Sequence, residues 1–116
     1  MLTPTQWWLA VLPIDLRCGM DRLLVAVRAK LDRDAFDGGG FVFCNRARTR
    51  IKVLVVDATG VWLCVRRLHE GSFVWPRTDA VACVLDAEQF GWLCAGVDWQ
   101  RLRAREPAQK CVMRQV

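Results

Sequence analysis

The chain has 116 residues, 53% of them hydrophobic and 25% charged, which is typical of a single globular domain. No apolar run reaches the roughly 18 residues that a membrane-spanning helix needs. Pro13 and Asp15 end the apolar run from Trp7 to Leu12, and no basic segment precedes that run, which argues against a signal peptide. We therefore expect a cytoplasmic protein with no membrane partner. The net charge of +5 is concentrated in residues 101–116, which hold five cations and one acid.

The first part of the chain predicts a strand, a helix and a glycine break. Residues 7–16 are apolar and broken by proline, which predicts a strand leading into a turn. Apolar residues of one helical face then recur at Met20, Leu23, Leu24, Val27 and Leu31. This spacing predicts a helix over about 19–31. Three consecutive glycines, 38–40, are expected to end regular structure there.

From Phe41 the apolar period changes to two, which predicts an antiparallel meander. The expected strands, separated by turn signals, are 41–44, 50–56, 61–68, 73–75 and 81–85. Asp86 and Gln89 have the spacing of a capping box and predict the start of a second helix, which Gly96 ends. The sequence thus predicts an α+β fold with a meander of about four to five strands packed against two helices. We expect this single domain to span 1–100 and a basic, flexible tail to span 101–116.

Alternating cations lie just before the apolar run 53–56. In an extended chain alternate residues share a face, and Arg66 and Arg67 at the end of the next strand are expected to enlarge the patch. Cations packed together repel one another, and a polyanion relieves that repulsion. Arginine also makes forked hydrogen bonds to phosphate. The predicted DNA-binding residues are Arg46, Arg48, Arg50, Lys52, Arg66 and Arg67. The alternative is a solvated strand face that binds nothing.

The sequence offers little for catalysis. The single histidine, His69, lies in a turn signal, so neither a catalytic triad nor a histidine-rich metal site is expected. The six cysteines include no Cys-x-x-Cys pair, and we expect them to be buried apolar residues. Asp15, Asp57 and Asp98 are candidates for a metal-binding trio, but each lies where Asp commonly serves a turn or a cap. We predict no catalytic residue, no metal site and no cofactor.

The tryptophans divide into core and surface candidates. Trp62, Trp92 and Trp99 lie in apolar periodic segments and are expected in the core. Trp75 stands beside Pro76 at the end of an expected strand, which makes it the candidate for a surface platform. Because tryptophan is enriched at binding hot spots, Trp75 and Pro76 are the predicted contacts for a protein partner.

Several motifs occur together in a family-specific order. In chain order they are 13–17 (PIDLR), 19–21 (GMD), 41–46 (FVFCNR), 50–54 (RIKVL), Asp57 with Gly60, 66–68 (RRL), 71–76 (GSFVWP) and 96–99 (GVDW). On these motifs the chain resembles the TnpB, or Orf-two-like, accessory proteins of IS-66-type insertion sequences, which are distinct from the RNA-guided nuclease of the same name. The resemblance covers roughly residues 9–100. Cys18 departs from it, since the family commonly has lysine there, and Val55 and Val56 stand where an aromatic residue often precedes the aspartate.

The resemblance implies a small helper encoded beside a separate, larger transposase and needed for efficient transposition without being the catalytic subunit. We therefore expect a non-enzymatic protein. Its expected partners are transposon DNA, the transposase and other proteins of the same element. The leading hypothesis is DNA binding through the six cations. The alternatives are an adaptor that docks on the transposase through an exposed indole or a sheet edge, with Trp75 as its anchor, and a metal-dependent nuclease.

Overall fold

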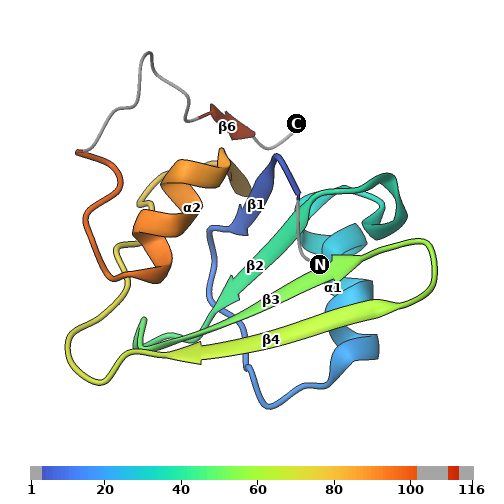
Figure 1. Cartoon of the computed structure of the whole chain (residues 1–116), viewed down its shortest axis with the longest axis horizontal. Helices are drawn as coiled ribbons and strands as arrows, with labels where there is room; N and C mark the ends of the chain where they lie inside the picture. Colours follow the sequence, from blue (N-terminus) through green and yellow to red (C-terminus); the bar gives the residue numbers. More distant parts are fainter. Residues whose placement is uncertain (1–3, 102–109, 113–116) are drawn as a thin grey trace.

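The computed structural model describes residues 4–101 and 110–112. Its elements in chain order are β1 (Trp7–Ala10), α1 (Met20–Leu31), the 3-10 helix η1 (Ala35–Asp37), β2 (Gly40–Cys44), β3 (Arg50–Val56), β4 (Val61–Arg67), β5 (Ala82–Leu85), α2 (Ala87–Cys94) and β6 (Lys110–Val112). The strands form one sheet in the order β4-β3-β2-β1-β5-β6 (Figure 1). The predicted α+β class is confirmed.

The sheet is mixed, which corrects the predicted purely antiparallel meander. β2, β3 and β4 follow one another as antiparallel neighbours. β1 runs parallel to β2 and antiparallel to β5. A parallel pair needs a crossover connection, and α1 lies in the segment that joins β1 to β2. The first strand therefore enters the middle of the sheet rather than its edge.

Both faces of the sheet are covered, each by one helix (Figure 1). Alternate residues of β1 belong to different cores: Trp7 and Leu9 pack with the α2 side, and Trp8 and Ala10 with the α1 side. All four residues of β1 are buried. This explains why the segment is apolar without alternation, as expected for a central strand buried on both faces.

Most of the predicted strands are confirmed to within a residue, but segment 73–75 is not a strand. Its Phe73 N–H donates to the carbonyl of Arg48 at 2.7 Å. The side chains of Phe73 and Trp75 are buried in the core under α2. The segment therefore packs across a face of the sheet and pairs with no strand.

The predicted caps of the second helix are confirmed. The Asp86 carboxylate accepts from the Gln89 N–H at 2.8 Å, and the Gln89 side chain accepts from the Asp86 N–H at 3.1 Å. Gly96 follows the helix with a φ of +77°, a conformation that favours glycine. In α1 the buried residues are Leu23, Val27 and Leu31, as the periodicity predicts.

The end of the glycine run has a packing role that the sequence did not reveal. Gly40 begins β2 and lies directly beneath the indole of Trp7, which stacks on Phe90 with ring centroids 3.7 Å apart and planes 4° apart. A Cβ added at Gly40 would overlap that indole, and even the third nearest ring atom, Cδ2, would be only 2.9 Å away. Glycine is required here for close approach.

Two further predictions concern the ends of the chain and the membrane. Most of the expected flexible tail, residues 102–109 and 113–116, lies outside the described residues. The described residues Lys110–Val112 form β6, which pairs with β5. Within the described ranges, no helix is both long and apolar enough to cross a membrane.

Replacing Gly40 tests the packing of β1 on β2. We expect Gly40→Ala to lower the free energy of unfolding by about 3 kcal/mol or more, the upper end for overpacking, because the Trp7 ring must move. Gly91→Ala is the matched control: Gly91 is exposed inside α2, a Cβ there meets nothing within 4 Å, and the change should stabilise by about 0.5–1 kcal/mol. Urea denaturation followed by tryptophan fluorescence measures both. Equal midpoints for the two variants would contradict this account.

Candidate nucleic-acid interface

The first half of the predicted basic stripe is a turn, because residues 45–49 connect β2 to β3. Asn45 organises the turn: its side-chain oxygen accepts from the N–H groups of Thr49 at 2.9 Å and Arg50 at 3.1 Å. The N–H of Arg48 donates to the Asn45 carbonyl at 3.1 Å, which closes a four-residue turn. The expected extended stripe over 46–52 is thus wrong before Arg50, since Asn45 satisfies the backbone groups that a strand would pair.

Arg48 occupies a conformation that arginine rarely adopts. Its φ is +63°, in the left-handed region that residues other than glycine adopt rarely and mostly in tight turns. Such a position costs a residue other than glycine, asparagine or aspartate about 1 kcal/mol. The Arg48 carbonyl accepts from Phe73, so the strained residue is held from both sides of its backbone.

The remaining cations divide between the two faces of the β3–β4 pair. Arg50 lies directly opposite Arg67, and residues opposite one another share a face. Both lie on the α1 side of the sheet, to which Leu54 also belongs. Arg66 lies opposite Ile51, on the α2 side. The predicted patch therefore gains Arg67 but not Arg66.

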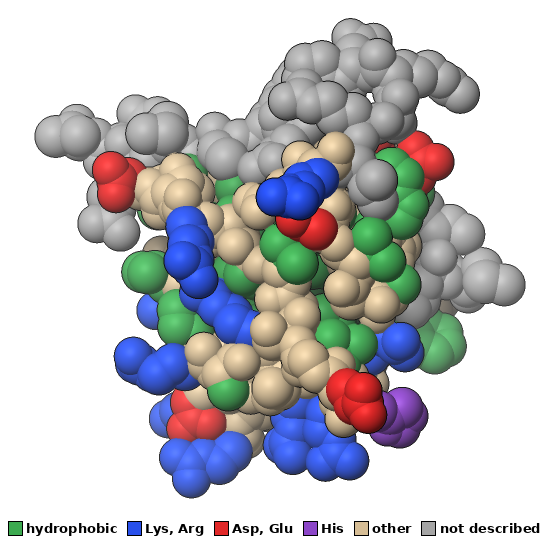
Figure 2. All heavy atoms as spheres, turned by 90° about the vertical axis from the view of Figure 1, so that its left-hand side faces the viewer, with side chains coloured by type: hydrophobic (Ala, Val, Ile, Leu, Met, Phe, Trp, Pro, Cys, Tyr) green, Lys and Arg blue, Asp and Glu red, His purple; other side chains and the backbone are tan. Residues whose placement is uncertain are grey.

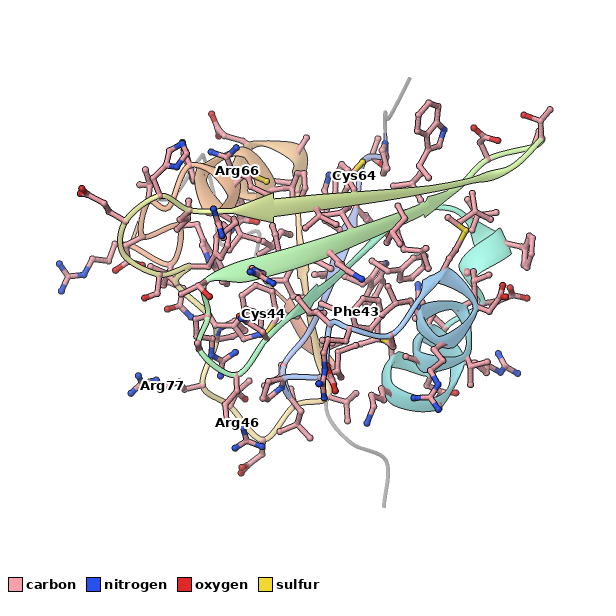
Figure 3. All side chains as sticks on the ribbon, turned by 90° about the horizontal axis from the view of Figure 1, so that it is seen from below. Phe43, Cys44, Arg46, Cys64, Arg66 and Arg77 are labelled. Carbon is pink, nitrogen blue, oxygen red and sulfur yellow. The ribbon has the colours of Figure 1, made fainter. Side chains whose placement is uncertain are left out.

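Arg66 has an intramolecular role. Its Nε donates to the carbonyl of Cys94, the last residue of α2, where the partial negative charge of a helix C-terminus favours a cation. Figure 3 shows Arg66 on the opposite side of the molecule from Arg46 and Arg77. Lys52 is also engaged, since its Nζ donates to the carbonyl of Cys18 at 3.0 Å and its side chain is partly buried.

Three exposed arginines remain at one end of the sheet, and we call this set the basic end: Arg46, Arg50 and Arg67. Among the described residues the ion pairs are Arg17–Asp15 and Arg101–Asp98, so neither pair includes an arginine of the basic end. Like charges opposite one another in a sheet are destabilising by roughly 0.5 kcal/mol. Figure 2 shows Lys and Arg side chains over the lower part of the face that it displays, with Asp and Glu side chains among them.

The expectation that Trp75 is a surface platform is wrong. Trp75 is only 5% exposed, its indole N–H donates to the carbonyl of Ala10 at 2.9 Å, and Pro76 is buried beside it. The exposed indole in the described part of the chain is that of Trp62, at 46%. Trp62 was expected in the core, but β4 is an edge strand, and the Trp62 N–H donates outside the core to Asp57 at 2.9 Å.

A pocket of about 500 Å³ opens beside the 45–49 turn. Its lining comes from three parts of the chain: Arg48, Ser72, Phe73, Val74, Trp75, Arg77 and Gln100. The Arg48 guanidinium carbon lies 5.8 Å from the centre of the Trp75 ring, and its Nη1 is buried without a hydrogen-bond partner. Sequence reasoning missed Arg77 and Gln100, because no spacing rule relates them to Arg48.

The aspartates considered for a metal site serve local turns instead. Hydrogen bonds from Arg17 hold the pKa of Asp15 at about 2. The Thr59 N–H, with the Trp62 and Gly60 N–H groups, lowers the pKa of Asp57 at the β3–β4 turn. Asp98 pairs with Arg101. No group of three or more His, Cys, Asp or Glu residues suited to a metal ion occurs within the described ranges.

The cysteines follow the buried, apolar expectation where their side chains are described. Cys44 and Cys83 are buried, and the others described are partly buried. Burial raises the pKa of the Cys44 thiol to about 11, although the neighbouring Arg48 opposes the rise. Burial likewise raises the pKa of Cys94 to about 11. Thiols with such pKa values are protonated at neutral pH and are poor nucleophiles.

Comparison with known proteins agrees with the motif resemblance. A family model described as IS66 Orf2-like protein matches residues 5–104. Two similar proteins of Sinorhizobium fredii, y4hO and y4jC, are both described as uncharacterized. The first is 36% identical over 93 residues, covering 80% of this chain and 81% of the relative. The second is 33% identical over 101 residues, covering 87% and 86%. No solved structure matches the chain. By its motifs and by this match, which spans most of its length, the chain belongs to the IS66 Orf2-like family.

Proposed function

We propose that the protein is a non-catalytic accessory protein for transposition of an IS66-type insertion sequence, and that it binds DNA through the basic end. Membership of the IS66 Orf2-like family supports the first part. The second part rests on one observation: Arg50 and Arg67 lie directly opposite one another, and neither ion pair of the described residues includes either of them. A chain that keeps this repulsion on its surface gains binding energy when an anion arrives.

The proposed contacts are with the phosphate backbone. The basic end combines Arg46 on a turn with Arg50 and Arg67 on two strands, so the three guanidinium groups come from separate segments at one end of the sheet. Each can fork onto a phosphate. Phosphate contacts position a protein on DNA but carry no sequence information. We therefore expect salt-sensitive binding with little sequence preference.

Lys52 and Arg66 contribute less in this proposal. Each already donates to a backbone carbonyl, of Cys18 and Cys94 respectively. A hydrogen bond to a carbonyl does not neutralise the cation, but it uses one of the side chain's N–H donors and holds the side chain against the protein. Their charges still add to the general attraction of an anion, while the directed contacts belong to Arg46, Arg50 and Arg67.

The proposal assigns the cutting of DNA to the separate transposase. The candidate carboxylates Asp15, Asp57 and Asp98 are engaged in separate local turns. His69 is the only histidine and lies exposed after β4. These positions suit structural roles and provide no general base beside a nucleophile.

Salt dependence tests the DNA proposal. Each phosphate contact adds about −0.9 to the slope of log affinity against log salt. We expect replacement of Arg46, Arg50 and Arg67 by Gln to make the slope less steep by about two to three, measured by fluorescence anisotropy on element-end and unrelated duplexes. The control variant replaces Arg22, Arg28 and Lys30 of α1 by Gln. These three residues are exposed, and the variant loses the same amount of positive charge. If both triple variants lose affinity equally, only net charge matters and the basic end is not the site.

A second candidate function follows from the sheet edge. β4 is an edge strand of seven residues, and its Trp62 and Val65 are 46% and 60% exposed. An exposed edge with an indole suits strand addition by a protein partner. In this alternative the protein docks on the transposase of the element and makes no direct contact with DNA.

Co-purification with the transposase discriminates the two functions. In the adaptor alternative, the complex survives nuclease treatment and high salt, and Trp62→Ala weakens it about tenfold, as expected for an indole hot spot. Val25→Ala on α1, where Val25 is 67% exposed, is the control and should leave the complex intact. Loss of the complex on nuclease treatment, or full retention by Trp62→Ala, would reject docking through β4.

A further inference from the structure

The pocket beside the 45–49 turn is a second, separate concentration of cationic groups. Arg48 and Arg77 line it from different segments, with Ser72 and Gln100 as further polar neighbours. None of its lining residues is acidic. We propose that this pocket binds one phosphate group, held between the two guanidinium groups.

Arg48 is a half-buried cation. Its Nη1 is buried without a partner, and neither ion pair of the described ranges includes this residue. A partly desolvated cation is unfavourable unless a counterion compensates it. An anion in the adjacent pocket supplies that compensation without any carboxylate of the chain.

Arg48 also has a backbone conformation that is unusual for arginine. A left-handed φ of +63° is a position for glycine or asparagine. The chain nevertheless carries arginine there, pinned by the hydrogen bond from Phe73. Strained backbone held in place by its surroundings is found at ligand-binding positions. The backbone conformation of Arg48 determines the direction in which its side chain leaves the loop. The Trp75 ring lies within cation–π distance of the Arg48 guanidinium.

The hydrogen-bond donors of the pocket favour a phosphate over a carboxylate. Two guanidinium groups from separate segments, a hydroxyl and an amide can together offer more donors than the two oxygens of a carboxylate accept. A phosphate has more oxygens and a larger charge, and forked arginine contacts match its geometry. The pocket volume of about 500 Å³ also leaves room for the group to which the phosphate is attached.

The site is independent of the DNA proposal, because inorganic phosphate alone tests it. The experiment measures the thermal unfolding midpoint in rising phosphate against chloride at matched ionic strength, since a ligand that binds the folded state raises the midpoint. We expect a saturable rise in phosphate only. Absence of that rise in the full-length protein would reject the site.

Three variants localise the effect. Arg48→Gly removes the cation while suiting the left-handed backbone, so it should unfold at an equal or higher midpoint without phosphate and bind phosphate about tenfold or more weakly. Arg77→Gln, at an exposed position, should weaken binding similarly and serves if Arg48→Gly folds poorly. Arg28→Gln, exposed on α1, should bind normally. Unchanged phosphate affinity in either pocket variant would overturn the two-arginine site.

Competition distinguishes the sources of the phosphate. Displacement of inorganic phosphate by an unphosphorylated strand would assign the pocket to the nucleic-acid backbone, and displacement only by a 5′-phosphorylated strand would assign it to a strand end. Displacement by neither would assign it to a small phosphate compound. If the protein binds phosphate but not DNA, the pocket stands as a phosphate site and the basic end is rejected as a DNA site. If it binds DNA but not phosphate, only the pocket is rejected.

Discussion

The close contact between β1 and β2 is the constraint on which the rest of the structure depends. Trp7 lies over the bare backbone of Gly40 and stacks on Phe90 of α2. Because β1 is central and buried on both sides, each face of the sheet must be covered, and the two helices cover one face each. The backbone that stays open to a partner includes the outer edge of β4 and the hairpin turns at the ends of the strands.

The turn after β2 and the pairing of β3 with β4 determine where the exposed arginines lie. Asn45 closes the turn with its side chain, Arg46 is exposed on this turn, and Arg48 has a left-handed conformation within it. The register of β3 and β4 then sets Arg50 against Arg67. The cations at this end are thus held by the same hydrogen bonds that define the hairpin. A rigid frame of this kind lowers the entropy that a ligand must remove on binding.

The proposed accessory role is consistent with the chemistry of the described residues. The carboxylates serve turns, the described thiols with shifted pKa values are protonated at neutral pH, and the arginines carry the distinctive chemistry. The basic end and the phosphate pocket both adjoin the 45–49 turn. The basic end lies on the α1 side of the sheet, and the pocket is lined by residues of the 72–77 segment. A phosphate in the pocket would also reduce the positive potential felt at the basic end, so occupancy of one would influence the other.

Local signals in the chain were sufficient for the elements and the family: the 3.6-residue period of α1, the capping box at Asp86 and Gln89, and most strand limits. They could not specify that β1 enters the sheet beside β2, that Arg66 turns to the C-terminus of α2, or that Trp75 is buried while Trp62 is exposed. Period-two patterning specifies that neighbouring residues point to opposite faces, but not which strand lies alongside or what covers each face. Those outcomes depend on contacts between residues far apart in the chain, as in the pocket that joins Arg48 to Arg77 and Gln100.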